Sequence, residues 1–158
     1  MPRIVPNLWF DMNGREAVDF YVSIFPNSRI VAEFPYTEAG PGPTGEIMEI
    51  DFELDGQPFA AINGGPQFTF DEAVSFLIEC EDQAEVDRYW DALLADGGEE
   101  SQCGWLKDRF GLSWQVVPKG MYEMMQGDPA AVDRAVTAML GMVKLDLAAL
   151  QAAYDGTA

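Results

Sequence analysis

Apolar and polar residues in the first part of the chain follow two different periods, which predict short strands and one helix. From residue 15 the apolar positions recur three or four apart, as on one face of a helix, until Pro26 ends the run. Over 48–54 the period is two, with Glu49, Asp51 and Glu53 between the apolar residues. The predicted elements are a strand over 4–10, a helix over 15–25 and strands over 29–36, 48–54 and 59–62.

The same order of elements recurs in the next part of the chain. Adding 68 to a residue number takes Tyr21 to Tyr89, and adding 55 takes Gly56 to Gly111. Two constant offsets that also agree in element type indicate an internal duplication of a β-α-β-β-β unit. The predicted elements of the second copy are a strand over 74–80, a helix over 84–94, short strands over 100–102 and 105–107, and a strand over 113–117.

The segment after Pro118 differs in character and is predicted to be helical. Asp128 and Pro129 have the pattern of a helix N-cap followed by proline at the first helical position, and a second helix is expected over 145–154. We expect these helices to pack on their own domain or on a dimer partner. The prediction is one α+β domain over 1–158, with module one at about 1–70, module two at about 71–118 and a helical tail at about 119–158.

Composition excludes several classes of function. With 27 Asp and Glu against 9 Lys and Arg, the net charge of −18 argues against nucleic-acid and anionic-membrane partners. The chain has no histidine, which excludes Ser-His-Asp and Cys-His catalysis and the His-based zinc motifs. Cys80 and Cys103 lack metal-ligand spacing, and there is no apolar run long enough for a signal peptide or a membrane span. We therefore expect a cytoplasmic protein with two free thiols.

Several local strings resemble one family over nearly the whole chain. They are LWFD at 8–11, FPNS at 25–28, FAAINGGP at 59–66, CGWL at 103–106, DRFGLSWQ at 108–115 and AMLGM at 138–142. These strings are similar to the PhnB-like branch, named 3-demethylubiquinone-9 3-methyltransferase, of the vicinal oxygen chelate superfamily. That superfamily also includes glyoxalase I, extradiol dioxygenases, fosfomycin-resistance enzymes and bleomycin-resistance proteins.

The resemblance implies a cavity, and in catalytic members a divalent metal. Each module would curl its sheet into a half-barrel, and two modules, from one chain or from two chains of a homodimer, would enclose the cavity. The four metal-ligand positions of the superfamily correspond to about Pro6, Ala60, Ser75 and Gln115. Two of these positions cannot bind a metal, Ser75 is a poor ligand and only Gln115 is a plausible one, whereas a transition metal needs three or four good donors. We therefore expect no resident metal or other cofactor; a divalent metal is the disfavoured alternative.

The candidate cavity residues each have a structural alternative. An acidic stripe of Glu49, Asp51 and Glu53 would either face solvent or line the cavity and select a cation or act as a general base. Asp11 and Glu79 would either favour a helix N-terminus or supply hard metal ligands. The tryptophans could fill the core, the asparagine could form a turn and Cys103 could be inert. The candidates are Trp9, Asn63, Ser75, Cys103, Trp105, Trp114, Gln115, Glu49 and Asp51.

Two functions from different classes follow, with a third kept open. The first hypothesis is a metal-free protein that binds a small molecule, as some resistance proteins sequester a drug; a cationic aromatic ligand fits the acidic, aromatic composition. The alternative is a lyase, isomerase or oxygenase that uses a metal or a carboxylate in a rearranged site. The third is a scaffold dimer without ligand. Methyl transfer is not expected, because Gly14 is the only glycine between the first strand and its helix.

Overall fold

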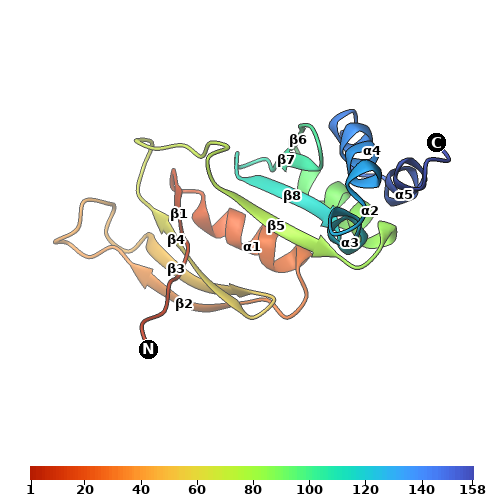
Figure 1. Ribbon diagram of the computed structural model, residues 1–158. Helices are drawn as coiled ribbons and strands as arrows, with labels where there is room; N and C mark the ends of the chain where they lie inside the picture. Colours follow the sequence, from red (N-terminus) through yellow and green to blue (C-terminus); the bar gives the residue numbers. More distant parts are fainter. The chain divides into compact units, whose positions relative to one another are not determined.

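Two units, Met1–Phe70 and Asp71–Ala158, make up the computed structural model, which describes residues 1–158 (Figure 1). In the first unit four strands form one sheet in the order β1-β4-β3-β2, in which β1 runs parallel to β4 and the other neighbours are antiparallel. The elements of this unit are β1 (Asn7–Phe10), α1 (Gly14–Ile24), β2 (Arg29–Pro35), β3 (Ile47–Leu54) and β4 (Gln57–Asn63).

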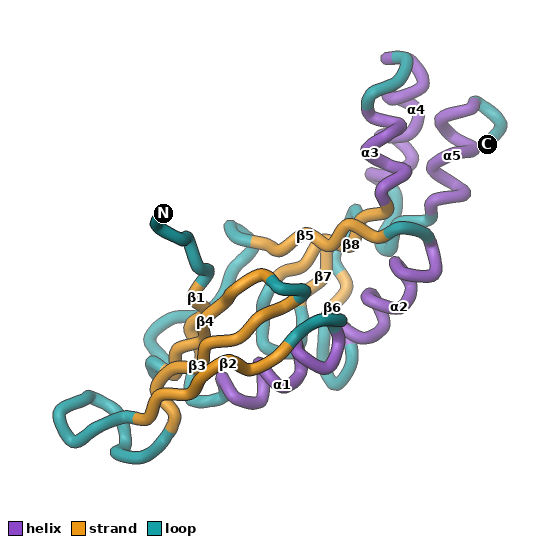
Figure 2. Tube along the Cα trace, turned by 90° about the horizontal axis from the view of Figure 1, so that it is seen from below, coloured by secondary structure: helices purple, strands orange, loops and turns teal.

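Helix α1 packs against one face of this first sheet, chiefly over β3 and β4 (Figure 2). The alternate residues Ile50, Phe52 and Leu54 of β3 are buried, and so is the apolar side of α1. Because side chains alternate along a strand, the residues between them point to the other side. We call the side away from the packing helix the far face of a sheet.

The second unit repeats the same sheet. Its strands follow the order β5-β8-β7-β6, with β5 parallel to β8, and α2 packs against β7 and β8. The identical strand order confirms the duplication and the α+β fold of two β-α-β-β-β modules. Neither four-stranded sheet closes into a barrel. The elements are β5 (Ser75–Cys80), α2 (Gln83–Leu94), β6 (Glu99–Glu100), β7 (Trp105–Lys107) and β8 (Ser113–Pro118).

The tail forms three helices that pack together in the second unit, α3 (Lys119–Met125), α4 (Pro129–Leu140) and α5 (Leu147–Asp155). The Asp128 side chain accepts a hydrogen bond from the Ala131 N–H at 3.2 Å, which confirms the predicted cap. Helix α3 lies within the predicted helical tail but was not named as a separate helix, since it lacks a capping side chain and includes Gly120. No helix here reaches the length and apolarity that crossing a bilayer requires.

Candidate functional site

Three residues that the sequence analysis singled out lie together on the far face of the second sheet. The Gln115 side-chain amide on β8 donates a hydrogen bond to the Ser75 hydroxyl on β5 at 2.9 Å. Trp105 lies directly opposite Gln115 on β7. All three are half-buried, so a polar pair and an indole share one accessible surface.

Ser113 belongs to the same face, two residues before Gln115 on β8. It lies directly opposite Ser75 on β5 and Lys107 on β7. Its side chain is 1% exposed and its hydroxyl has no hydrogen-bond partner. A buried polar group left unpaired costs about 1–3 kcal/mol. The sequence analysis missed Ser113, although the period of two counted from Gln115 would have placed it on this face.

The acidic stripe lies on the far face of the first sheet. Register places Glu49 beside Ile62 and Ile62 beside Trp9, and in the next row Asp51 lies beside Ala60. Glu49 and Asp51 are half-buried. This far face of the first sheet therefore combines carboxylates with an aromatic ring.

Trp9 and Glu53 on that face already have partners. The Trp9 indole N–H donates to the Gly65 carbonyl at 2.9 Å, and its ring meets the edge of Phe68 at a centroid distance of 4.9 Å. Glu53 forms an ion pair with Arg29 at 2.9 Å. Of the stripe, Glu49 and Asp51 are thus the carboxylates that we consider for a ligand.

Trp114 lies on the opposite face of the second sheet, because it alternates with Ser113 and Gln115. It is 3% exposed, and its indole N–H donates to Asp108 at 2.9 Å. The other carboxylate oxygen of Asp108 accepts the N–H groups of Phe110 and Leu112 at 2.9 and 3.1 Å. Trp114 therefore anchors the turn before β8, and we leave it out of the site.

Asn63 is held by the fold through both ends of its side chain. Its oxygen accepts the Gly14 N–H at 2.8 Å, its amide nitrogen donates to the Ile47 carbonyl at 3.0 Å, and it is 5% exposed. A Cβ on Gly14 would lie 2.7 Å from the Asn63 oxygen, so the glycine allows this close approach. Because both polar atoms of this buried side chain already hold the backbone, we leave Asn63 out of the site as well.

The expected helix-terminal roles of Asp11 and Glu79 are taken by other residues. Asn63 accepts the first N–H of α1, in place of a residue next to the helix. Asp82 is the N-cap of α2, and its carboxylate accepts the Glu85 N–H at 2.9 Å. A side chain caps a helix when its oxygen accepts one of the first free N–H groups, and here Asn63 and Asp82 are the acceptors.

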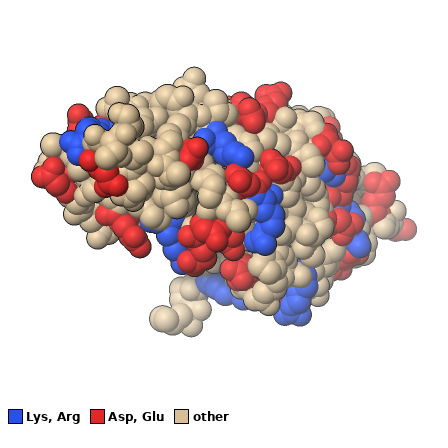
Figure 3. Space-filling model, turned by 90° about the vertical axis from the view of Figure 1, so that its right-hand side faces the viewer, with Lys and Arg blue, Asp and Glu red and all other residues tan.

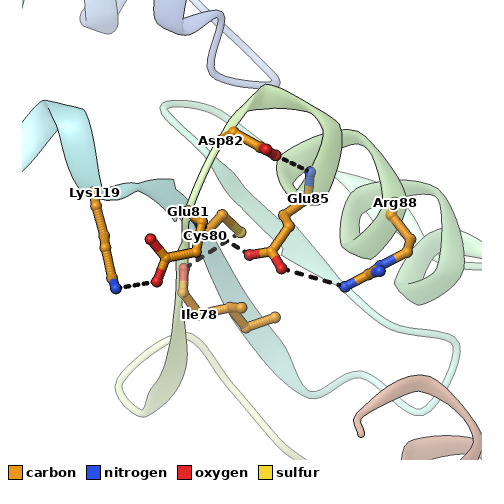
Figure 4. Close-up of polar contacts among 7 residues, drawn as sticks. All are labelled: Ile78, Cys80, Glu81, Asp82, Glu85, Arg88 and Lys119. Atoms are coloured by element: carbon orange, nitrogen blue, oxygen red, sulfur yellow. Dashed lines mark hydrogen bonds and ion pairs between the residues drawn. The ribbon is translucent and has the colours of Figure 1, made fainter.

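Cys80 is fully buried next to that cap (Figure 4). Burial, aided by the negative charge of Glu85, raises the pKa of the Cys80 thiol to about 12. Its sulfur lies 3.9 Å from the Ile78 carbonyl oxygen. Glu85 also pairs with Arg88, and Lys119 pairs with Glu81 at the surface. The thiol is protonated and enclosed, which suits a core residue and not a nucleophile.

Cys103 lies in a turn that contacts the tail. Its backbone has a φ of 57°, its N–H donates to the Met142 carbonyl at 2.9 Å, and the next N–H, of Gly104, donates to Val143 at 2.8 Å. The turn is therefore shaped by its attachment to the segment between α4 and α5. Cys103 is half-buried but precedes β7, so we leave it out of the far-face site.

The superfamily's metal-ligand positions do not fit a metal in this chain. Ala60 has no donor atom, and the Gln115 amide nitrogen is bonded to Ser75, which leaves one amide and one hydroxyl oxygen. The Pro6 carbonyl accepts the Ala60 N–H at 2.9 Å as part of the sheet. No group of three or more acidic, cysteine or histidine side chains is placed to hold a metal ion. A transition metal needs three or four good donors.

Charge is spread over the surface in both signs. Figure 3 shows acidic side chains over much of one face, with Lys and Arg side chains between them. Most basic residues form ion pairs, such as Arg29 with Glu53 and Lys144 with Asp87. The excess of acids is therefore a distributed surface property, and the far-face carboxylates are a small part of it.

Comparisons with known proteins support one family. The sequence model of the family described as 3-demethylubiquinone-9 3-methyltransferase matches residues 2–117. None of the curated proteins compared with the chain matches it. Because the matched region ends at residue 117, helices α3 to α5 lie beyond it.

Solved structures show the same fold. A Bacillus cereus protein, described as PhnB and 3-demethylubiquinone-9 3-methyltransferase, is 34% identical, with 74% of this chain and 99% of that chain covered and a TM-score of 0.67. Protein PA1353 from Pseudomonas aeruginosa is 26% identical, with 75% and 98% covered and a TM-score of 0.60. The fosfomycin resistance protein FosX from Listeria monocytogenes is 18% identical, with 80% and 98% covered and a TM-score of 0.54, and supports the fold alone.

Proposed function

The chain belongs to the 3-demethylubiquinone-9 3-methyltransferase family, a PhnB-like branch of the vicinal oxygen chelate superfamily, and on that premise we propose that it binds a small organic molecule without a metal. The ligand would contact the far face of the second sheet. The observation that carries this proposal is Ser113, whose hydroxyl is buried and unpartnered beside the Ser75–Gln115 pair. A folded chain gains free energy when a ligand supplies the missing partner.

The far face of the second sheet supports recognition of an uncharged polar group. Ser113 can donate its hydroxyl hydrogen to a carbonyl or hydroxyl oxygen of the ligand, and the Gln115 amide oxygen can accept a hydrogen bond. Trp105 on the neighbouring strand offers apolar contact area. A few placed polar groups beside an aromatic surface are typical of small-molecule sites.

The far face of the first sheet, considered by itself, favours a positively charged group. Glu49 and Asp51 lie on the same face as Trp9. Carboxylates attract a cation, and the indole contributes apolar surface beside them. This surface also supports the alternative function, in which one of these carboxylates serves as a general base in a lyase, isomerase or oxygenase reaction.

We do not propose methyl transfer, which the family name suggests. Cofactor-binding doubly wound folds have a mostly parallel sheet between two layers of helices. Here each sheet has one parallel pair, β1 with β4 and β5 with β8, and its other pairs are antiparallel. The sheet architecture therefore gives no support to the activity in the family name.

A thermal-shift screen of the whole chain with organic cations and neutral metabolites tests the proposal. For a compound that binds, Ser113→Ala is expected to weaken binding by about tenfold, the value of one buried hydrogen bond. Without ligand, this variant is expected to unfold at the same temperature as the original chain or at a higher one. Ser101→Ala, an exposed serine of the same unit, is the control. Undiminished affinity in both Ser113→Ala and Gln115→Ala would refute the site, and turnover of a hit would support the enzyme alternative.

We further propose that two copies associate and that the protein works in the cytoplasm. The resemblance to the superfamily supports the dimer, and apolar side chains such as Phe34 and Leu77, which are 44% and 43% exposed, offer surface for it. Both cysteines are free, as in a reducing compartment. Light scattering on the eluting protein measures the mass, and a single-chain mass at high concentration would refute the dimer.

A further inference from the structure

A groove of about 650 Å³ lies among the tail helices of the second unit, between α3, α5 and the start of α2. It lies mostly beyond the residues that the family model matches, since α3 begins at Lys119. It is formed by residues of one unit and is separate from the far-face residues Ser75 and Gln115. Its lining includes Gly120, Glu123, Met124, Leu147, Gln151 and Tyr154.

Small residues keep the floor of the groove open. A Cβ on Gly120 would lie 3.0 Å from a methyl carbon of Leu147, so any larger side chain would enter the space. Met124 is 5% exposed and belongs to a core against which the partly buried Met121 and Met125 pack. Methionine side chains adapt their shape to irregular contacts. The groove therefore offers an apolar and adaptable floor.

One negatively charged side chain and no positively charged side chain line the groove. Glu123 lines the groove, is exposed and forms no ion pair.

The nearby basic residues have other partners: Lys119 pairs with Glu81, and Lys144 with Asp87 at 2.8 Å. Arg134 donates to backbone carbonyls of α5. The Gln83 amide at one end is bonded to the backbone on both sides of the α5 N-terminus. An apolar floor beside one uncompensated carboxylate complements a cation with an apolar body.

We propose that this groove binds a small amphipathic organic cation, with its apolar or aromatic body on Met124, Leu147 and Tyr154 and its ammonium group beside Glu123. An anion of the same shape is disfavoured by Glu123 and by the net charge of −18. Because the residues differ from those of the far-face site, this inference stands or fails independently of the proposed function.

Titration of the ¹⁵N-labelled full chain with benzyltrimethylammonium in low salt tests the groove by NMR. The expected result is saturable shifts of the Gly120, Glu123 and Gln151 backbone amides. Glu123→Gln keeps the shape and removes the charge, and it should weaken binding by about two- to fivefold, as expected for one exposed charge contact. Asp133→Asn, an exposed acid on α4 outside the groove, makes the same change in net charge and should leave the affinity unchanged. Added salt should weaken binding to the original chain.

Four outcomes would overturn the proposal. One is the absence of saturable shifts at the groove. Another is equal affinity of Glu123→Gln and the original chain for benzyltrimethylammonium. A third is that phenylacetate, an anion of similar shape, binds as tightly as benzyltrimethylammonium. The last is shifts confined to Ser75, Ser113 and Gln115, which would assign the cation to the far-face site and leave the proposed function intact. Gly120→Leu, which fills the floor, should abolish the shifts if its spectrum is otherwise folded.

Discussion

At the scale of single residues, Asn63 joins three elements of the first unit. Its side chain connects the N-terminus of α1 with the start of β3, and its carbonyl accepts a hydrogen bond from the Tyr36 hydroxyl. Asn63→Ala should lower the free energy of unfolding by about 2–4 kcal/mol, because it leaves the buried Gly14 N–H and the Ile47 carbonyl unpaired. Urea unfolding of the full chain measures this change.

Asn13 provides the control for that prediction. It is the N-cap of α1 by position but makes no side-chain capping bond. Asn13→Ala should change the free energy of unfolding by less than about 0.5 kcal/mol. If the two variants are equally stable, the hydrogen bonds of Asn63 do not hold the helix terminus in solution.

The two cysteines should differ sharply in reactivity. Cys80 is 0% exposed with a pKa raised to about 12, so it stays protonated below pH 10, whereas Cys103 is half-buried. A thiol reagent at pH 8 should label only Cys103 in the folded chain, and both cysteines after unfolding. Cys103→Ser should abolish the native labelling. Native labelling of Cys80 at a similar rate would contradict the packing around it.

The site could be predicted from sequence only where local alternation decides it. The period of two in 48–54 correctly places Glu49 and Asp51 on one face, but it does not say which face the helix covers. Asn63 shows the limit: its partners are 49 and 16 residues away, and no local pattern reveals such contacts. Ser113 was missed because an unpaired hydroxyl is a property of packing.

At the scale of elements, the hydrophobic period predicted nearly every strand and helix, and the ends of elements less well. β1 begins at Asn7 and not at residue 4, since Pro6 has no N–H to donate to the sheet. In α4 the buried residues are Ala131 and Ala135, while Leu140 is 63% exposed. Small alanines let α4 approach its neighbours closely. Helix propensity does not predict such contacts.

The tail is tied to α2 by Gln83, which gives a prediction for a whole element. Its amide donates to the Leu145 carbonyl at 3.0 Å and accepts the Leu147 N–H at 2.8 Å. Gln83→Ala should speed hydrogen exchange at the start of α5 by about tenfold, with little change in the β8 amides. Gln126→Ala, an exposed glutamine at the end of α3, is the control. Unchanged exchange at Leu147 would mean that other contacts hold α5.

At the scale of the whole molecule, the two sheets share one topology but not one register. Asn7 faces Ala60 in the first sheet, and the offsets of 68 and 55 would place Ser75 opposite Gln115. The structure pairs Ser75 with Ser113 instead. A shift of two residues keeps each side chain on its face, so the apolar pattern tolerates it. The duplication was therefore readable from sequence, whereas the exact neighbours of Gln115 were not.

The net charge of −18 predicts how the whole chain responds to salt. Most acids have no basic partner, so like charges repel more strongly in the compact chain than in the unfolded one. Screening weakens this repulsion and also the surface ion pairs, but the acids outnumber the bases 27 to 9. Raising NaCl from about 20 to 300 mM should therefore raise the unfolding temperature by about 3 °C. KCl should act equally, since screening depends on ionic strength; an effect of one cation only would indicate a specific site. A fall in the unfolding temperature would mean that ion pairs such as Lys144–Asp87 outweigh the excess negative charge.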